Sequence, residues 1–138
     1  DDCFSYVTGR GKDIFKTSKG KYIEPSVLES YFGNITEFQQ MCVVGLGLDQ
    51  PILLAVPSEK AKSDKNEVSK KLSKFLSDVN ADLDGYKKIK KIILVKEEWI
   101  PENGLTTPTL KIKRAKIDER FSENYQDWYK SSEDVIWE

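Results

Sequence analysis

The sequence predicts one α+β domain, in which a small mixed β-sheet with an N-terminal β-hairpin is packed against about three helices. Three observations predict this class. Two nearly continuous apolar runs, MCVVGLG and PILLAVP, are typical of central strands buried on both faces. Apolar residues recur at helical spacing after these runs and again near the C-terminus. The length of 138 residues suits a single domain with a real hydrophobic core.

The first part of the chain predicts a strand, a hairpin and a short helix. FSYVTGR, residues 4–10, alternates bulky and polar residues and then turns, as a short strand does. A hairpin follows, with its tip at Ser18, Lys19 and Gly20. A helix opens at Pro25, where the first turn needs no amide donor, and a Gly-Asn pair ends it.

The remainder predicts strands alternating with helices. A turn at residues 49–51 joins the two apolar strands, and residues 58–66 are expected to form a polar loop. A long amphipathic helix then ends near Gly85, and IKKIILVKEEW is a third strand. A loop, a short extended segment and a final helix from about Lys116 follow, and residues 131–138 are expected to be a frayed acidic tail.

Composition excludes several kinds of chemistry. The formal net charge is -1, so no global field attracts nucleic acid or an anionic membrane. Histidine is absent, which removes histidine acid-base catalysis, Ser-His and Cys-His nucleophile pairs and most catalytic zinc sites. We therefore expect no metal site in this chain.

Two further features bear on the origin and compartment of the chain. It begins Asp-Asp-Cys-Phe and its only methionine is Met41, so we expect a processed product or a piece of a longer protein. Cys3 and Cys42 lack Cys-x-x-Cys spacing and are expected to be reduced cytosolic thiols. Neither a signal peptide nor an apolar run long enough to span a bilayer is evident.

Two groups of lysines deserve weighing. Lys87, Lys88, Lys90 and Lys91 flank the third strand and predict a solvated strand edge, since a single-strand RNA site would need interleaved aromatics. In LTTPTLKIKR, Lys111 follows a proline turn that restricts the backbone direction. A lysine held in this way suits contact with phosphate or carboxylate oxygens, and the alternative is a solvent-facing side chain.

Three segments in order carry a family resemblance. FSYVTGRGKDIFKTSKGKYIEPSVLE, VVGLGLDQPILLAV and ENGLTTPTLKIKRAKIDERF resemble the C-terminal lid domain of the adenylate-forming enzymes, and most of all the long-chain fatty acid–CoA ligases. The resemblance covers residues 4–129. It implies that residues 1–10 are the last strand and the start of the hinge from a large N-terminal AMP-binding domain, and that residues 11–138 are the lid.

The resemblance implies a two-step ligase. A fatty acid attacks ATP to give acyl-AMP and pyrophosphate; the lid then rotates, and CoA forms the thioester. ATP and Mg²⁺ would be bound mainly by the N-terminal AMP-binding domain, which is the expected partner, with CoA as co-substrate. No nucleic acid partner is implied. The isolated chain is expected to be inactive and cytoplasmic, with peripheral membrane attachment left open through the missing part.

Residue roles follow from the same resemblance. Lys111 matches the adenylation lysine that bridges the carboxylate and the α-phosphate, and Arg10 matches the arginine near the ribose. Lys12 matches the hinge position. The hairpin tip, Ser18, Lys19 and Gly20, matches the loop that lines the pantetheine tunnel after rotation.

The chain departs from the family pattern at three points. Leu110 and Lys111 follow Thr109 where Ser-Gly-Lys is common, Thr106 stands where the long-chain subclass often has leucine, and Lys19 replaces a tip glycine. Two other functions remain open. One is a non-catalytic binding module of the same fold, and the other is the lid of an adenylating enzyme for another carboxylate class.

Overall fold

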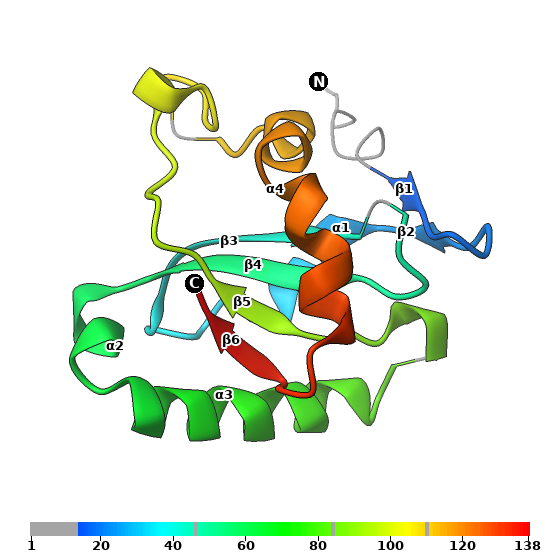
Figure 1. Ribbon diagram of the computed structural model, residues 1–138, viewed down its shortest axis with the longest axis horizontal. Coiled ribbons are helices and arrows are strands. Elements are labelled where there is room, and N and C mark those ends of the chain that lie inside the picture. The colour runs from blue at the N-terminus through cyan, green and yellow to red at the C-terminus, as the bar shows by residue number, and fades with distance from the viewer. Residues whose placement is uncertain (1–13, 46, 84, 110) are drawn as a thin grey trace.

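A mixed sheet lies at the centre of the computed structural model, which describes residues 14–45, 47–83, 85–109 and 111–138 (Figure 1). The strands are β1 (Phe15–Lys16), β2 (Tyr22–Ile23), β3 (Phe38–Val44), β4 (Ile52–Pro57), β5 (Ile92–Leu94) and β6 (Val135–Trp137). The α-helices are α1 (Pro25–Ser30), α2 (Glu59–Ser63), α3 (Lys65–Asn80) and α4 (Arg114–Lys130). Short 3₁₀ turns lie at Gly85–Lys87 and Pro101–Asn103.

The four-stranded sheet has the order β3-β4-β5-β6, and β1 and β2 form a separate hairpin. β3 and β4 are antiparallel, whereas β4, β5 and β6 run parallel to their neighbours. Parallel neighbours need crossover connections. The α2–α3 segment supplies the first of these and α4 the second.

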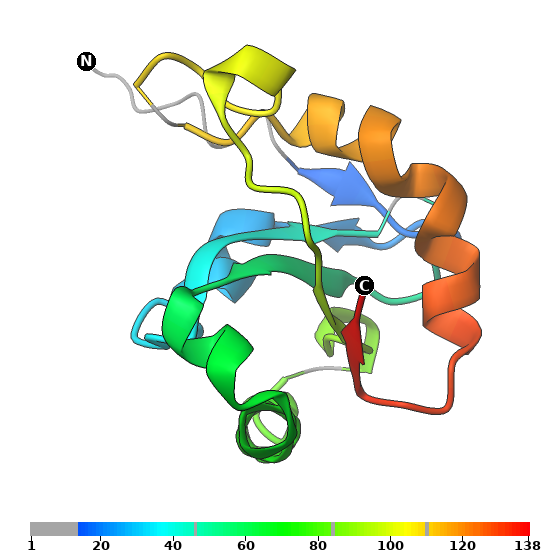
Figure 2. The same ribbon diagram turned by 60° about the vertical axis from the view of Figure 1, so that its left-hand side comes forward.

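Alternation along the strands divides the core into two layers. Val43, Leu53 and Ile92 point to the face covered by α1 and α3. Leu54 and Ile93 point to the opposite face, where α4 packs. Figure 2 shows α3 and α4 on opposite sides of the sheet.

Much of the predicted architecture is confirmed. The hairpin forms where expected, α1 begins at Pro25, and α3 and α4 bury the apolar faces that their spacing indicates. The predicted mixed sheet with packed helices is therefore correct. The strand expected at residues 4–10 lies outside the described residues.

The prediction of a loop over residues 58–66 is wrong. Ser58 accepts a hydrogen bond from the Ala61 amide (3.2 Å) and caps α2, and Asp64 caps α3 through the Glu67 amide (3.3 Å). The segment is polar and was therefore expected to be a loop. Two successive N-caps and the burial of Ala61 stabilise it as helix instead.

The prediction of a frayed tail at residues 131–138 is also wrong, because residues 135–137 form β6 beside β5. Val135 is buried, and Glu138 donates its amide to the Leu94 carbonyl (2.9 Å). A third correction concerns β3, which lies at the edge of the described sheet and not at its centre. Its buried end is covered by α1 and α4.

Candidate functional site

The Lys111 loop, residues 105–113, is a closed backbone structure of which Leu110 lies outside the described part. The Thr107 amide donates to the Lys111 carbonyl (2.8 Å), and the Lys111 amide donates to the Thr107 hydroxyl (3.1 Å). The Lys113 amide donates to the Leu105 carbonyl (2.9 Å). Both backbone groups of Lys111 are thus fixed by Thr107.

The start of this loop is fixed by Asn103. Its side-chain oxygen accepts from the Ile100 and Leu105 amides (3.2 Å each), and its nitrogen donates to the Glu98 carbonyl (2.8 Å). Gly104 has φ 78°, in the left-handed region that favours glycine. The Asn-Gly pair therefore sets the direction in which the chain reaches the loop.

The Lys111 side chain is exposed at the surface. Among the described residues, none of the hydrogen bonds or ion pairs of the structure ends on its ammonium group. The loop therefore presents a positive charge on a fixed backbone, without internal neutralisation in the described part.

The hairpin tip, Ser18, Lys19 and Gly20, is held by residues far away in sequence. The Ser18 amide donates to the Leu48 carbonyl (2.9 Å), and the Ser18 hydroxyl donates to Asp49. The Lys19 ammonium lies 4.0 Å from the same carboxylate. Gly20 has φ 81°, so this tip position favours glycine. Asp49, which the sequence indicated only as a turn residue, is a tip-binding residue that sequence reasoning missed.

The structure does not bring the hairpin tip and the Lys111 loop together. Figures 1 and 2 both show the hairpin between β1 and β2 well separated from the segment that precedes α4. Arg10 and Lys12 lie outside the described residues, so only Lys111 and the tip are placed.

A second feature that the sequence did not indicate is an ion pair next to the Lys111 loop. Arg114 Nη2 lies 2.7 Å from Glu29 Oε2, with 15% and 22% of the two side chains exposed. Both side chains also bond the backbone of Val43 on β3. No local spacing links residues 29, 43 and 114, so only the folded chain reveals the group.

Buried titratable groups lie under α4. The Tyr125 hydroxyl donates to Asp118 Oδ1 (2.8 Å), and burial raises the pKa of both side chains. Cys42 is a free, fully buried thiol whose pKa burial raises to about 12. Because the thiol stays protonated at neutral pH, Cys42 is not a reactive nucleophile.

The sequence predicted that the lysines around β5 form one solvated edge, and this prediction is wrong for Lys91. Lys91 is 3% exposed and its ammonium donates to the carbonyls of Ser131 and Glu133, the latter at 2.7 Å. Burial lowers its pKa. Lys91 is therefore a structural residue that ties the chain before β6 to β5, whereas Lys90 is exposed.

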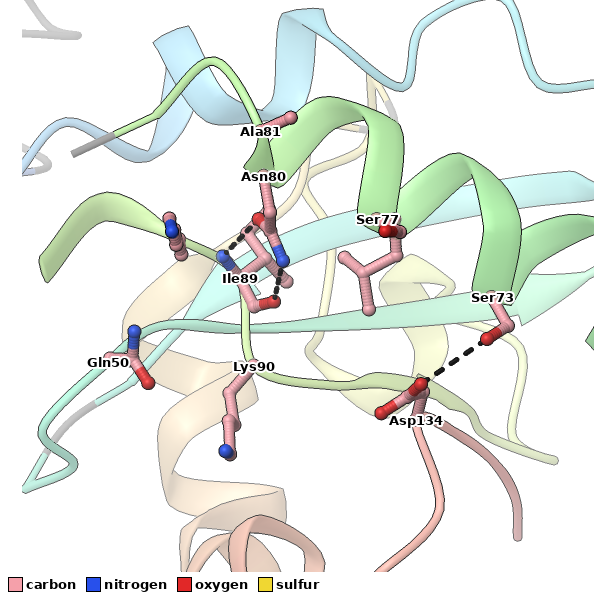
Figure 3. Close-up of a pocket in the computed structure, with 10 residues that line it drawn as sticks. Gln50, Ser73, Ser77, Asn80, Ala81, Ile89, Lys90 and Asp134 are labelled. Carbon is pink, nitrogen blue, oxygen red and sulfur yellow. Dashed lines mark hydrogen bonds between the residues drawn. The ribbon is translucent and has the colours of Figure 1, made fainter. Parts of the chain in front are cut away.

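A pocket of about 480 Å³ lies between α3 and the segment before β5 (Figure 3). Asn80 exchanges two hydrogen bonds with the Ile89 backbone (2.8 and 2.9 Å), and Ser73 donates to Asp134 (3.3 Å). These contacts join α3 to the segment before β5 and to the segment before β6. Neither Lys111 nor the hairpin tip, residues 18–20, lines this pocket.

The described residues contain neither a candidate metal site nor a candidate membrane-spanning helix. In this part of the chain, no group of three or more His, Cys, Asp or Glu side chains is arranged to hold a metal ion. None of the helices described is both long and apolar enough to cross a membrane.

The sequence and the fold both resemble those of known proteins. The family described as AMP-binding enzyme C-terminal domain matches residues 8–133. Peroxisomal long chain acyl-CoA synthetase 6 of Arabidopsis thaliana is 31% identical over 144 residues, covering 90% of this chain and 20% of that protein. Long-chain-fatty-acid–CoA ligase 5 of Rattus norvegicus is 29% identical over 147 residues, covering 93% of this chain and 22% of that protein. The chain thus spans about a fifth of the length of these relatives.

Solved structures show the same fold. The adenylation domain of a carboxylate reductase from Mycobacterium chelonae superposes with a TM-score of 0.70 at 22% identity, covering 88% of this chain and 20% of that one. The A domain of carboxylic acid reductase from Segniliparus rugosus, in complex with AMP and a co-purified carboxylic acid, superposes with a TM-score of 0.71 at 24% identity. The match covers 87% of this chain and 20% of that one.

Proposed function

Because the chain belongs to the family of AMP-binding enzyme C-terminal domains, we propose that it is the mobile lid of a long-chain fatty acid–CoA ligase. Residues 1–10 would be the last strand and the start of the hinge from a large AMP-binding domain, and residues 11–138 would be the lid. The enzyme first adenylates a fatty acid with ATP, and it then transfers the acyl group to CoA after the lid rotates.

The observation that carries this proposal is Lys111. Its ammonium is exposed and its backbone is bonded on both sides to Thr107. In the first step a carboxylate approaches the α-phosphate of ATP, and two anionic groups must be held together. A fixed positive charge lowers their repulsion, and it stabilises the charge that develops as pyrophosphate leaves.

The hairpin tip is proposed to act in the second step. Asp49 holds Ser18 at the tip and lies near Lys19, so the tip would reach the pantetheine arm of CoA as a preformed turn. Its separation from the Lys111 loop is what two steps with two lid orientations would require (Figure 1). Arg10 is proposed to contact the nucleotide near its ribose, and Lys12 is proposed as the hinge.

ATP, fatty acid and CoA are the substrates in this proposal. The family resemblance implies that Mg²⁺ is bound mainly by the large AMP-binding domain, and we assign it there. What this chain contributes is charge and positioning.

The test is pyrophosphate release by the full-length enzyme with ATP, Mg²⁺ and palmitate. Lys111→Ala should lower this rate by roughly 10²–10³-fold, the typical loss for one well-placed charge. Thioester formation from supplied acyl-AMP should be much less affected, because the α-phosphate chemistry is then already complete.

Lys116→Ala is the matched control, because Lys116 is an exposed lysine whose ion pair with Glu119 (3.5 Å) lies on the surface of α4. Its rates should be unchanged. Equal loss of both half-reactions in Lys111→Ala would contradict the role of Lys111. Absence of pyrophosphate release with every fatty acid would favour another carboxylate class, if other acids support release, or else a non-catalytic binding module.

A further inference from the structure

We propose that Arg114, through its pair with Glu29, is a positioning residue that sets the place of Lys111 during acyl-adenylate formation. The inference deepens the proposed function and rests on it. Its basis is a cluster of hydrogen bonds that joins three elements immediately after the Lys111 loop.

The cluster covers part of β3, the edge strand of the described sheet. Arg114 Nε donates to the Val43 carbonyl (3.0 Å), and the Val43 amide donates to Glu29 Oε2 (2.8 Å). Arg114 Nη2 donates to the same carboxylate oxygen (2.7 Å). The two side chains thus bond both backbone groups of Val43, as a neighbouring strand would, and they hold α1, β3 and α4 together.

Local signals do not explain an arginine at this position. Arg114 is the first residue of α4, where the helix dipole disfavours a positive charge, and the first turn contains no acidic residue. The N-cap residue, Lys113, makes no side-chain capping hydrogen bond. The start of α4 is therefore fixed by tertiary contacts, with the Glu29 carboxylate compensating the arginine.

The position of Arg114 fixes one end of the Lys111 loop. The Lys113 amide bonds Leu105, and Arg114 is the next residue, so one end of the closed loop continues directly into the anchored residue. Arginine also suits the task better than lysine, because its planar fork donates in two directions at once. A shift of the loop end would carry the Lys111 ammonium away from the reacting groups.

The experiment uses Arg114→Lys in the full-length enzyme, with the two half-reactions measured separately. Arg114→Lys keeps the charge and loses the fork. Acyl-adenylate formation should slow by roughly 10–100-fold, because a displacement of about 1 Å can cost about 10²-fold. Thioester formation from supplied acyl-AMP should stay within about twofold.

A double-mutant cycle supplies a measurement that a purely structural role would not produce. In the Lys111→Ala background, Arg114→Lys should change adenylation by less than about threefold, since the residue acts through a lysine that is gone. Arg120→Lys is the matched control. Arg120, which is on the same helix as Arg114, donates two hydrogen bonds to Glu97 (2.8 and 2.9 Å), but its side chain is 57% exposed. Loss of this exposed fork should leave both half-reactions unchanged.

Circular dichroism checks that each variant is folded. If Arg114→Lys is unfolded, Glu29→Gln replaces it. The glutamine amide oxygen can still accept the hydrogen bond from the Val43 amide, but the negative charge that pairs with Arg114 is lost. The same selective loss of adenylation is expected. Equal loss of both half-reactions, full additivity with Lys111→Ala, or unfolding of both variants would overturn the inference. Full adenylation by Lys111→Ala would instead refute the role of Lys111, and absence of fatty acid adenylation by the unaltered enzyme would refute the proposed function itself.

Discussion

Glu37 is a nearly buried carboxylate that makes an ion pair with an exposed lysine. Its side chain is 7% exposed, and Oε2 accepts from the Lys71 ammonium (2.9 Å), which is on a side chain 62% exposed. The hydrogen bond from Lys71 lowers the pKa of Glu37 below its ordinary value of 4.5, against the opposing effect of burial. Because its partner is solvated, we expect this pair to contribute about 1 kcal/mol or less.

The lowered pKa gives the pair a defined pH dependence. A carboxyl group whose pKa is lower in the folded state stabilises the protein above its unfolded pKa, and it loses that contribution as pH falls through the folded value. We therefore expect the stability difference between the wild type and Glu37→Gln to be constant near neutral pH and to shrink below about pH 4.5.

Thermal unfolding between pH 3 and pH 7, roughly the window set by this linkage, measures the difference. Glu119→Gln is the control, because Glu119 pairs with Lys116 on the surface of α4 (3.5 Å) and is 68% exposed. Glu119→Gln should change the unfolding temperature only slightly, because exposed ion pairs contribute little to stability. A Glu37→Gln difference that grows toward low pH would contradict the assignment.

At this scale the sequence predicted a directed Lys111 but not how it is held. Pro108 and the Asn-Gly pair indicate a stiff turn from local chemistry alone. The bonds of Thr107 to Lys111 depend on the chain folding back on itself, and those of Arg114 depend on elements about 70 and 85 residues away. Contacts over such separations have no local pattern to reveal them.

Among the elements, β6 depends on a buried lysine. Lys91 donates to the carbonyls of Ser131 and Glu133, and the Ile92 amide donates to the Asp134 carbonyl (2.9 Å). The chain that follows α4 is thereby held beside β5. Acidic composition predicted a frayed tail, because nothing in residues 131–138 shows that a lysine 40 positions earlier satisfies their carbonyls.

Lys91→Met should therefore destabilise the protein and loosen β6 first. Methionine fills similar space but leaves two carbonyls without their charged donor, which costs about 1–3 kcal/mol. Denaturant unfolding gives the total change, and hydrogen exchange at the Ile92 and Glu138 amides reports on β6.

Lys90→Met serves as the comparison for this substitution, because the Lys90 side chain is exposed. It should change stability by less than about 0.5 kcal/mol, as surface substitutions usually do. Equal effects of the two substitutions would show that the buried ammonium contributes nothing specific.

For the whole molecule, the fold class was predictable and the sheet topology was not. Apolar runs and helical spacing establish strands and helices, because they report burial directly. They do not specify which strands become neighbours, and so β3 was expected at the centre although it lies at the edge. Strand order depends on the crossovers through α3 and α4, and the side of the sheet that each helix covers is set only in the folded chain.

One face of the molecule has exposed apolar side chains on the hairpin, on α1 and on the residue that follows α1. Tyr22 is 65% exposed, Val27 50% and Tyr31 44%. Tyr22 and Val27 also line a hollow of about 220 Å³ with Ile14 and Leu28. Side chains of this kind on a lid domain are suited to meet the large AMP-binding domain that we propose, and they would be exposed to water in the isolated chain.

The isolated chain should be catalytically inert without the AMP-binding domain that we propose, and it should self-associate weakly through this exposed apolar face. Tyr22→Ser combined with Val27→Ser should weaken that association by roughly tenfold or more, since about 1.4 kcal/mol of lost apolar burial is sufficient. Sedimentation over a range of concentrations measures it, and the unfolding midpoint should hardly change because both side chains are at least half exposed. Unchanged association in the double variant would mean that this face is not the one that seeks a partner.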